Sequence, residues 1–370
     1  MLKKIVKKIR QLPSKYPVSQ KKPLKAYYNW LLANYEMTVH AETVNAKPLK
    51  LTIDPTNICQ LQCPFCPTGA KQHTRKPGKA EMEMVPNLLS EVGDCLFSID
   101  FYNWGEPLLN LDVLLHWIEA AKSKNIITAI SSNMSVPLTK DQAEKIVASG
   151  LDRIIISIDG ASEETYSRYR VNGKFNLVIE NAKKIIEAKK CTSKKGPWIV
   201  WRFLVFGHNE HEIEQASSMA HELGFDEIIF SVPSVNQCEE RDTWVAKDPR
   251  YCPQNQIQHK IPSRCDWHYV SAAINYDGTI NPCCALHKME DDFGSIGRTG
   301  EYSYMKAFNS SHYKNIRKSL SSKVVLEPSM SCNRCPIPGI KDYAKELNRQ
   351  ILILLLLRIF RATPVLKLLV

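Results

Sequence analysis

From residue 49 to residue 232, short apolar runs alternate with longer segments in which apolar residues recur every three or four positions. A short apolar run predicts a buried strand, and the longer spacing predicts a helix with one buried face. Six strands are predicted, at 49–54, 97–102, 126–130, 153–158, 198–205 and 227–232. Four helices are predicted between them, near 108–123, 139–149, 176–190 and 211–223. Strands that alternate with helices form parallel β/α units, and six strands favour an open, partial (β/α)6 barrel of the α/β class.

The segments on either side of this pattern are basic or strongly apolar. Residues 2–12 place apolar side chains at helical spacing with basic ones between them. That pattern is typical of an amphipathic helix on an anionic membrane surface or of a solvated basic arm. Residues 24–35 predict an aromatic-rich helix that packs on the barrel, and residues 351–357 are seven apolar residues in a row, far fewer than the ~20 that span a bilayer. The tail is therefore expected to form an interfacial or docking helix, or to pack on the barrel itself.

These patterns divide the 370-residue chain into five parts. We expect a basic N-terminal extension at 1–48, the barrel at 49–232, a linker at 233–250, a small α+β cysteine-rich unit at 251–340 and a hydrophobic, basic tail at 341–370. Of the net charge of +11, residues 1–50 carry +9, from eleven Lys and Arg against two Glu. A nucleic-acid-binding fold spreads its basic charge over a folded surface, so we expect no nucleic-acid partner.

The chain has twelve cysteines but no secretory signal, because the longest early apolar run is only two residues long. Secreted proteins use many cysteines as disulfides, whereas cytoplasmic proteins keep them reduced. We therefore interpret the cysteines as metal ligands of a cytoplasmic protein. Peripheral attachment to the inner face of the membrane through the termini is the alternative location.

The first candidate chemistry follows the first predicted strand directly. Cys59, Cys63 and Cys66 lie on one loop in a C-x3-C-x2-C spacing. Three thiolates hold three irons of a [4Fe–4S] cube and leave the fourth iron without a protein ligand. A structural zinc site normally takes four protein ligands, and this loop has three cysteines and no histidine. An iron–sulfur cluster is therefore favoured over a zinc knuckle or unrelated buried thiols.

Other unusual residues follow the next three strands. The segment 103–107 contains Trp-Gly-Glu-Pro, the segment 131–133 is Ser-Ser-Asn, and Ser157 and Asp159 lie at the end of the fourth strand. The carboxyl ends of parallel strands meet at one edge of a barrel, where β/α barrels keep their active sites. We therefore expect these residues to surround the cysteine loop.

The cysteine spacing, with Phe65 before the last cysteine, resembles the signature of the radical S-adenosylmethionine (radical SAM) enzymes. The resemblance implies that the methionyl amine and carboxylate of S-adenosylmethionine (SAM) chelate the open iron. A reduced cluster would then cleave SAM and release a 5′-deoxyadenosyl radical. Residues 104–107 are similar to the family's G-G-E-P motif, with Trp104 in place of the first glycine. The turn would bring its backbone carbonyls and the Glu106 carboxylate toward the SAM amine.

The resemblance also implies roles for residues of the later strands. Ser157 and Asp159 are two apart, so in a continuous strand they point to the same face, like the pair that binds the ribose hydroxyls in relatives. Arg170 is the candidate partner of the SAM carboxylate because its guanidinium binds in a bidentate way, with Arg168 as the alternative. Adenine is expected near the aromatic ring of the cysteine loop. The expected SAM-binding residues are Phe65, Gly105, Glu106, Pro107, Asn133, Ser157, Asp159 and Arg170.

A second cysteine set lies in the smaller unit. Cys265, Gly278 and Cys283 follow a C-x12-G-x4-C spacing, and Cys332 and Cys335 a later C-x2-C spacing. Residues 275–278 predict a hairpin turn between short strands, which would bring the first two of these cysteines together. The pattern resembles the first half of the SPASM domain, in the shortened form that holds one auxiliary cluster.

The ligands of this second site have alternatives. Four thiolates on one [4Fe–4S] cube leave no open iron, which favours electron transfer or a structural role. A four-cysteine zinc site fits the same spacing. Cys284 is an alternative to Cys283, because neighbouring thiols point in different directions, and Cys252 is a spare candidate.

Together the two resemblances imply an oxygen-sensitive enzyme that abstracts a hydrogen atom from its substrate, with the auxiliary cluster as an electron relay. Relatives oxidise or epimerise sugars and aminocyclitols, or modify ribosomal peptides. Residues 1–48 do not look like a peptide-leader-binding module, which favours a small molecule or a glycan over a peptide. A non-catalytic iron–sulfur or zinc scaffold is the rival from another class. The expected electron donor is a flavodoxin or ferredoxin.

Overall fold

A computed structural model describes residues 22–192, 196–233, 244–252, 265–297 and 303–322, together with residues 332, 348, 351, 352 and 355. The predictions for residues 2–12, for most of the linker and for Cys335 lie outside these residues.

The described strands form one sheet in the order β6-β5-β4-β3-β2-β1-β7-β8-β9. The first six strands are parallel and form the expected open, partial barrel, so all six predicted strands are confirmed. Every residue of the first and fourth strands is buried, as expected where helices cover a parallel sheet. The bounds are β1 (Lys50–Ile53), β2 (Ser98–Asp100), β3 (Ile127–Ser132), β4 (Arg153–Ser157), β5 (Trp198–Leu204) and β6 (Glu227–Ser231).

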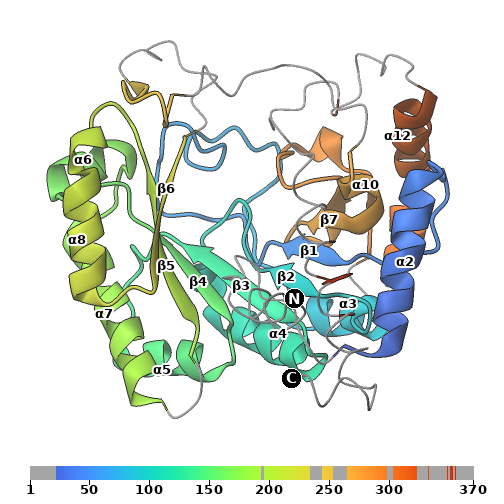
Figure 1. Ribbon diagram of the computed structural model, residues 1–370, viewed down its shortest axis with the longest axis horizontal. Helices are drawn as coiled ribbons and strands as arrows, with labels where there is room; N and C mark the ends of the chain where they lie inside the picture. The colour runs from blue at the N-terminus through green and yellow to red at the C-terminus, as the bar shows by residue number, and fades with distance from the viewer. Residues whose placement is uncertain are drawn as a thin grey trace, which may run out of the picture.

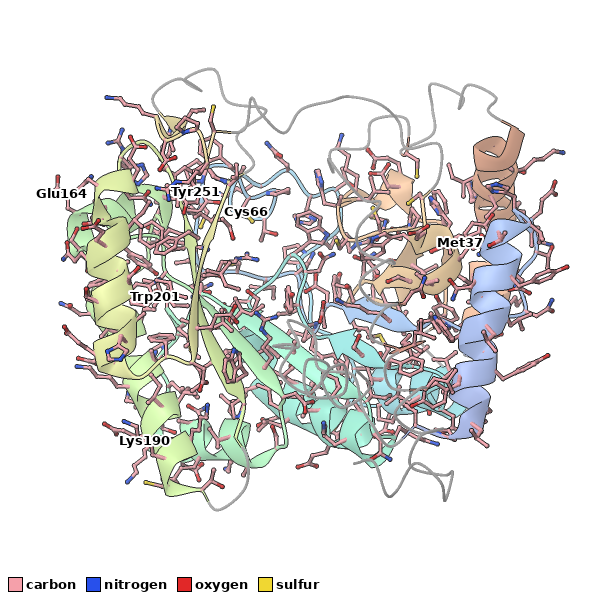
Figure 2. The ribbon with its side chains drawn as sticks, viewed as in Figure 1. Met37, Cys66, Glu164, Lys190, Trp201 and Tyr251 are labelled. Carbon is pink, nitrogen blue, oxygen red and sulfur yellow. The ribbon has the colours of Figure 1, made fainter. Side chains whose placement is uncertain are left out.

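The four predicted helices are confirmed and flank the sheet (Figure 1). They are α4 (Leu111–Ser123, preceded by the 3-10 turn η1, Pro107–Asn110), α5 (Lys140–Ala148), α7 (Phe175–Cys191) and α8 (Ile213–Leu223, preceded by η2, Glu210–Glu212). On β5, the fully buried Trp201 contacts Phe225 at a ring-centroid distance of 5.3 Å on the side covered by α8 (Figure 2).

Two barrel helices were not predicted. The helix α3 (Met84–Val92) precedes β2, and α6 (Glu163–Tyr169) follows β4. Apolar residues at helical spacing bury one face of α3, and Pro86 is tolerated because it lies in the first turn. Ser162 begins α6 as an N-cap, since its side chain accepts a hydrogen bond from the Thr165 N–H.

The cysteine-rich unit extends the same sheet rather than standing apart from it. The strand β7 (Ser271–Ile274) pairs in parallel with β1, and the antiparallel strands β8 (Thr279–Asn281) and β9 (Gly294–Ser295) follow. The predicted hairpin is therefore confirmed, and Gly278 adopts a φ of +80° in its turn. The remaining described elements of this unit are α10 (Trp267–Val270), η4 (Met289–Asp291), α11 (Tyr304–Phe308) and α12 (Ser311–Ser322).

The predicted aromatic helix before the barrel is α2 (Leu24–Thr38), which packs against α10 and runs along the edge of the molecule opposite α8 (Figure 1). The described residues of the tail contact it. Trp30 Nε1 donates to Asn348 Oδ1 at 2.7 Å, and Ile351 is fully buried in the main hydrophobic core. This part of the tail therefore packs on the protein itself. No helix among the described residues is long and apolar enough to cross a membrane.

Candidate functional site

The three cysteines of the first loop lie together at the carboxyl ends of the barrel strands. Cys59, Cys63 and Cys66 follow β1, and all three line one cavity of about 440 Å³. Residues from the ends of β2, β3, β4 and β5 line the same cavity, so the structure brings together the strand-end segments that the sequence singled out.

Hydrogen-bond donors approach the cysteine sulfurs. Asn133 Nδ2 donates to Cys59 Sγ at 3.5 Å, and Gln60 Nε2 donates to Asn133 Oδ1 at 2.8 Å and so orients the amide. Arg170 Nη1 lies 3.9 Å from Cys63 Sγ. Donors of this kind stabilise negative charge on sulfur.

These donors alone do not offset the cost of burying the cysteines as thiolates. Burial raises the pKa of Cys59 to about 12 and that of Cys63 to about 11, because the low-dielectric surroundings disfavour the charged form. A group of cationic irons would compensate for that cost. Among the described residues, no three His, Cys, Asp or Glu side chains converge on one point as the ligands of a single metal ion do. A [4Fe–4S] cube does not require this, because each thiolate binds a different iron, so the donor set fits a cluster.

The turn after β2 is held against the cysteine loop. Asp54 is buried at the end of β1, and its carboxylate accepts hydrogen bonds from the Trp104 N–H (3.0 Å) and the Gly105 N–H (3.4 Å). Thr68 Oγ1, from the cysteine loop, donates to the Trp104 carbonyl at 2.7 Å. A Cβ at Gly105 would lie 1.8 Å from the Thr56 carbonyl oxygen, so only glycine allows this close approach.

Glu106 lines the cavity, but its carboxylate is already engaged. It accepts hydrogen bonds from the Leu108 N–H, the Ser132 hydroxyl and the Asn133 N–H, at 3.1, 2.8 and 2.8 Å. Burial raises its pKa and these three bonds oppose the rise. Glu106 therefore ties the turn after β2 to the end of β3. The Gly105 carbonyl, by contrast, accepts no hydrogen bond from any described residue, and Pro107 begins η1 behind it.

The structure separates the two residues that were expected to share one face. Ser157 is the last residue of β4 and lines the cavity, whereas Asp159 is fully buried and does not. Alternation holds only within a strand, and this strand ends before Asp159. Asp159 instead accepts from Arg170 Nε at 2.5 Å and from the Leu204 N–H at 2.7 Å.

Phe65 lies in a cluster of aromatic rings beside the cysteine loop. Its ring centroid is 6.0 Å from that of Tyr169, 6.2 Å from that of Phe206 and 4.9 Å from that of Trp244. Trp244 belongs to the segment predicted as a linker, so the described end of that segment packs on the loop. Tyr169 lines the cavity and Phe65 does not.

The second cysteine set gathers around α10. Cys265 and Trp267 form a buried cluster with Cys283 and Cys284 packed against it. Burial raises the pKa of Cys283, and the neighbouring thiols, Cys332 and Cys265 among them, add to the rise. Cys284 instead lines the main cavity.

A further side chain approaches the second set. His268 Nε2 lies 3.7 Å from Cys332 Sγ. Cys265, Cys283 and Cys332 therefore share one neighbourhood. Cys284 packs against the same cluster but also lines the main cavity.

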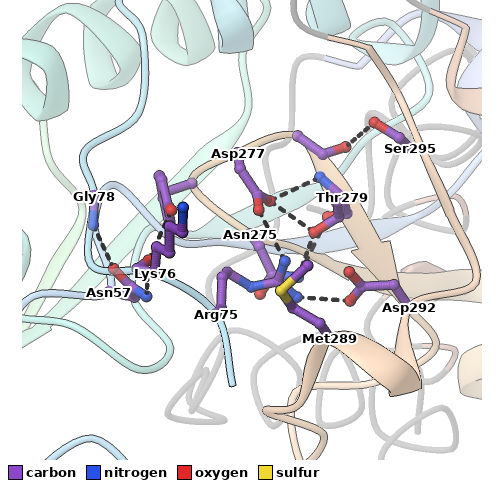
Figure 3. A network of polar contacts seen from close by, with 12 residues as sticks. Asn57, Arg75, Lys76, Gly78, Asn275, Asp277, Thr279, Met289, Asp292 and Ser295 are labelled. Atoms are coloured by element: carbon purple, nitrogen blue, oxygen red, sulfur yellow. Dashed lines mark hydrogen bonds and ion pairs between the residues drawn. The ribbon is translucent and has the colours of Figure 1, made fainter. Parts of the chain in front are cut away.

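A buried arginine ties the two cysteine sites together. Arg75 follows the first cysteine loop, and its guanidinium bonds Asp277 Oδ2 at 2.8 Å and Asp292 Oδ1 at 2.7 Å, both in the cysteine-rich unit (Figure 3). Beside it, Asn57 Nδ2 donates to the Lys76 carbonyl at 3.0 Å (Figure 3). These contacts fix the first loop relative to the β7–β8 hairpin.

Several lining residues were not singled out from the sequence. They are charged or polar residues within strands or just after them, on the cavity side of the barrel. For the charged residues, the sequence signal is a charge in an otherwise apolar strand, because such a side chain must face the interior of the barrel. Tyr102 has no such signal. These residues are Lys50, Asp100, Tyr102 and Arg202.

Comparisons with known families agree with this arrangement. Residues 53–220 match the radical SAM superfamily, and residues 265–336 match the SPASM iron–sulfur cluster-binding domain. The chain belongs to the radical SAM superfamily. It carries a C-terminal SPASM domain, so the expected family and fold class are both confirmed. The expected cofactors follow from the same matches: a [4Fe–4S] cluster with SAM, and an auxiliary iron–sulfur cluster.

Individual proteins of known name resemble the chain at low identity. A GTP 3′,8-cyclase from Desulforamulus reducens is 25% identical over 51% of this chain and 56% of its own length. An AdoMet-dependent heme synthase from Methanosarcina barkeri is 26% identical over 60% of this chain and 63% of its own. The chain thus spans less than two thirds of these curated relatives. Streptococcus suis SuiB, crystallised with S-adenosylmethionine, shares the fold with a TM-score of 0.55 and 17% identity, over 86% of this chain and 78% of its own.

Proposed function

We propose that this protein is a radical SAM enzyme that abstracts a hydrogen atom from a small-molecule or glycan substrate and so oxidises or epimerises it. The observation that carries the proposal is the shared cavity: three cysteines of one loop line it together with polar residues from four further strands. A [4Fe–4S] cluster with SAM bound to its open iron supplies reductive cleavage of SAM and a 5′-deoxyadenosyl radical. The protein's own part is to bind, orient and enclose the reactants.

Three cysteines and two neighbouring side chains have a proposed part in binding the cluster. Cys59, Cys63 and Cys66 are the ligands, and Asn133 and Arg170 stabilise charge on the first two sulfurs through the contacts described above. Because the three cysteines are the only protein ligands proposed for four irons, one iron remains open for SAM.

The residues around the loop are proposed to hold SAM. The Gly105 carbonyl, which lacks a donor among the described residues, accepts from the SAM amine. Ser157 binds a ribose hydroxyl, and Arg170 faces the carboxylate while Asp159 holds it in place. Glu106 acts by fixing the turn, and Phe65 acts through Tyr169, which it packs against at the cavity wall.

The second cysteine set is proposed to hold the auxiliary cluster, with Cys265, Cys283, Cys332 and Cys335 as ligands. Support comes from the three described cysteines, because Cys283 lies near both Cys265 and Cys332. The two sites would then belong to two units, at 49–232 and 251–340, joined through Arg75 and the shared sheet.

We infer a cytoplasmic location and a flavodoxin or ferredoxin as electron donor, because the proposed clusters need a reducing compartment and a one-electron reductant. For membrane attachment at the inner face we propose residues 2–12 as the candidate segment, because the described part of the tail is engaged with the protein: Ile351 is buried in the core.

Anaerobic reaction with SAM and dithionite tests the proposal. The reconstituted protein is expected to form 5′-deoxyadenosine and to contain roughly eight irons per chain when both clusters are present. The Cys59→Ala variant should form none and keep roughly four irons. An unchanged 5′-deoxyadenosine yield in this variant, or no product from an iron-loaded wild type, would contradict the proposal. In the second case the protein would be a scaffold rather than an enzyme.

A further inference from the structure

One cation on the cavity wall lacks a partner among the residues that the structure describes. Three cationic side chains line the cavity: Lys50, Arg170 and Arg202. Lys50 Nζ lies 2.5 Å from Asp100 Oδ2, and Arg170 Nε lies 2.5 Å from Asp159 Oδ2. Within the described part of the chain, Arg202 has neither an ion pair nor a side-chain hydrogen bond, and its Nε is buried without an acceptor.

An unpaired guanidinium in such a place is costly. A partly buried charge without a partner loses hydration that nothing in the protein replaces. Arg202 lies in the middle of β5, directly beside Ser157 in the register of the sheet, so its backbone is fixed. The side chain is thus held with its donors toward the cavity, which is the arrangement of a binding group rather than of a solvated surface arginine.

A second hydrogen-bonding group accompanies Arg202. Tyr102 lines the same cavity, and no hydrogen bond to its hydroxyl is made by the described residues. Burial raises the pKa of Tyr102, with Arg202 among the nearby groups that oppose the rise. Tyr102 therefore remains a neutral phenol, and its hydroxyl can donate a hydrogen bond to an anion.

Arg202 and Arg170 have different neighbours. Arg170 lies beside Cys63, Tyr169 and Tyr166, next to the first cysteine loop. Tyr102, which Arg202 influences, lies near Lys50, Asp100 and Cys284, from β1, β2 and the segment after β8. The methionyl group of SAM has to reach the cluster, which places it with Arg170. Arg202 lies beside Ser157, at the proposed ribose end of SAM, where SAM has hydroxyl groups and no anion. Because Arg170 already faces the SAM carboxylate, Arg202 is left for an anionic group of the molecule bound next to SAM.

We propose that Arg202 and Tyr102 bind an anionic group, a carboxylate or a phosphate, on the substrate of this enzyme. The substrate class is thus an acidic or phosphorylated small molecule or glycan, such as a uronic acid or a sugar phosphate. A guanidinium matches both groups because its donors form two parallel hydrogen bonds to either. The inference rests on the proposed function, according to which the cavity holds a substrate as well as SAM.

The test compares probes that differ only in charge. Glucuronate, glucose 6-phosphate and uncharged glucose are titrated into the anaerobically reconstituted protein with SAM, and binding is followed by saturation-transfer NMR. We expect both anionic sugars to bind and glucose not to bind at the same concentrations. The affinities for glucuronate and glucose 6-phosphate show whether the site prefers a carboxylate or a phosphate.

Variants assign the binding to Arg202. Arg202→Gln is expected to weaken binding of the preferred anion about 10- to 100-fold, in line with the loss of a charge-assisted hydrogen-bond pair. Arg202→Lys keeps the charge but loses the two parallel hydrogen bonds of the guanidinium. Its affinity for the anion should therefore lie between those of the wild type and Arg202→Gln. Arg250→Gln is the matched control, because Arg250 is exposed and pairs with Asp248 away from the cavity. Iron content and circular dichroism establish that each variant is folded.

Four results would overturn the assignment. They are equal binding of glucose, unchanged anion binding in both Arg202 variants, a loss of SAM affinity in Arg202→Gln, and tighter binding of a tetraglutamate peptide than of either sugar. SAM cleavage by dithionite is measured on the same samples. If the wild type forms no 5′-deoxyadenosine, the proposed function fails whether or not anions bind. If it forms product but binds no anion, only the Arg202 assignment fails.

Discussion

Arg170 and Asp159 form a buried ion pair with a Nε–Oδ2 distance of 2.5 Å, and the same arginine reaches to within 3.9 Å of Cys63 Sγ. Asp159 is fully buried and the Arg170 side chain is 12% exposed. The aspartate therefore acts through the arginine: it fixes the position of a cation beside the cluster loop. This arrangement gives Asp159 a role in the site without any contact to the cavity.

Replacing Asp159 should destabilise the fold. Asp159→Asn leaves the buried charge of Arg170 without its partner, and removal of one member of a buried ion pair costs about 3–5 kcal/mol. We expect a decrease of that size in the free energy of unfolding, measured by urea denaturation of the reduced, cluster-free protein. Asp248→Asn removes an exposed pair with Arg250 and should leave the midpoint unchanged. If Asp159→Asn and Asp248→Asn have the same urea midpoint, the buried pair does not contribute to the stability of the fold.

The glycine of the turn after β2 should not tolerate a methyl group. In Gly105→Ala the new Cβ would meet the Thr56 carbonyl oxygen at 1.8 Å, so the backbone has to move. We expect at least a tenfold loss of SAM affinity, which corresponds to about 1.4 kcal/mol. Gly294→Ala is the control, because its nearest contact would be an ordinary 3.5 Å. Unchanged SAM binding by equilibrium dialysis in Gly105→Ala would remove this turn from the SAM site.

The neighbouring cysteines after β8 should separate by function. Cys283 has Cys265 and Cys332 as neighbours, whereas Cys284 lines the main cavity. Cys283→Ser is expected to lose one cluster, with a fall from roughly eight to four irons per chain. Cys284→Ser is expected to keep all of them. Iron analysis and the visible absorption of the reconstituted variants decide the question, and the reverse outcome would make Cys284 the ligand.

Asp54 should give the protein a distinctive pH dependence. Burial raises its pKa to about 7 from an ordinary value of 3.8, so the folded state binds this proton more tightly than the unfolded state does. The stabilising contribution is complete below pH 3.8 and is lost as the pH rises to 7, by about 4 kcal/mol in total. The free energy of unfolding of the wild type should therefore fall relative to that of Asp54→Asn over this range. If the free energies of unfolding of the wild type and Asp54→Asn change with pH in the same way, the raised pKa of Asp54 is refuted.

The sequence predicted the barrel well because its strands are buried on both sides. The residues of β4, for example, form a continuous apolar run between clear breaks, and the cysteine loop has an unusual and specific spacing. The pairing of β7 with β1 could not be foreseen, because register between distant strands leaves no local signal.

The site was harder to predict where a side chain's direction decides its role. Strand alternation places Asp159 on the same face as Ser157, but β4 ends at Ser157 and the direction of the chain changes there. The engagement of the Glu106 carboxylate depends on Ser132 and Asn133, which are distant in sequence. Arg202 could not be predicted because it lies within a predicted strand. A charge there indicates an inward-facing side chain only when helices are known to cover the outer face of the sheet.

Binding of SAM depends on one iron that the three cysteines leave free. Electron–nuclear double resonance on the reduced, reconstituted protein, with SAM labelled with 15N in its amine, tests this most directly. We expect a 15N hyperfine coupling to the [4Fe–4S] cluster in the wild type and no such coupling in Cys59→Ala. A fully loaded wild-type cluster without the coupling, or zinc in place of iron at Cys59, Cys63 and Cys66, would contradict it.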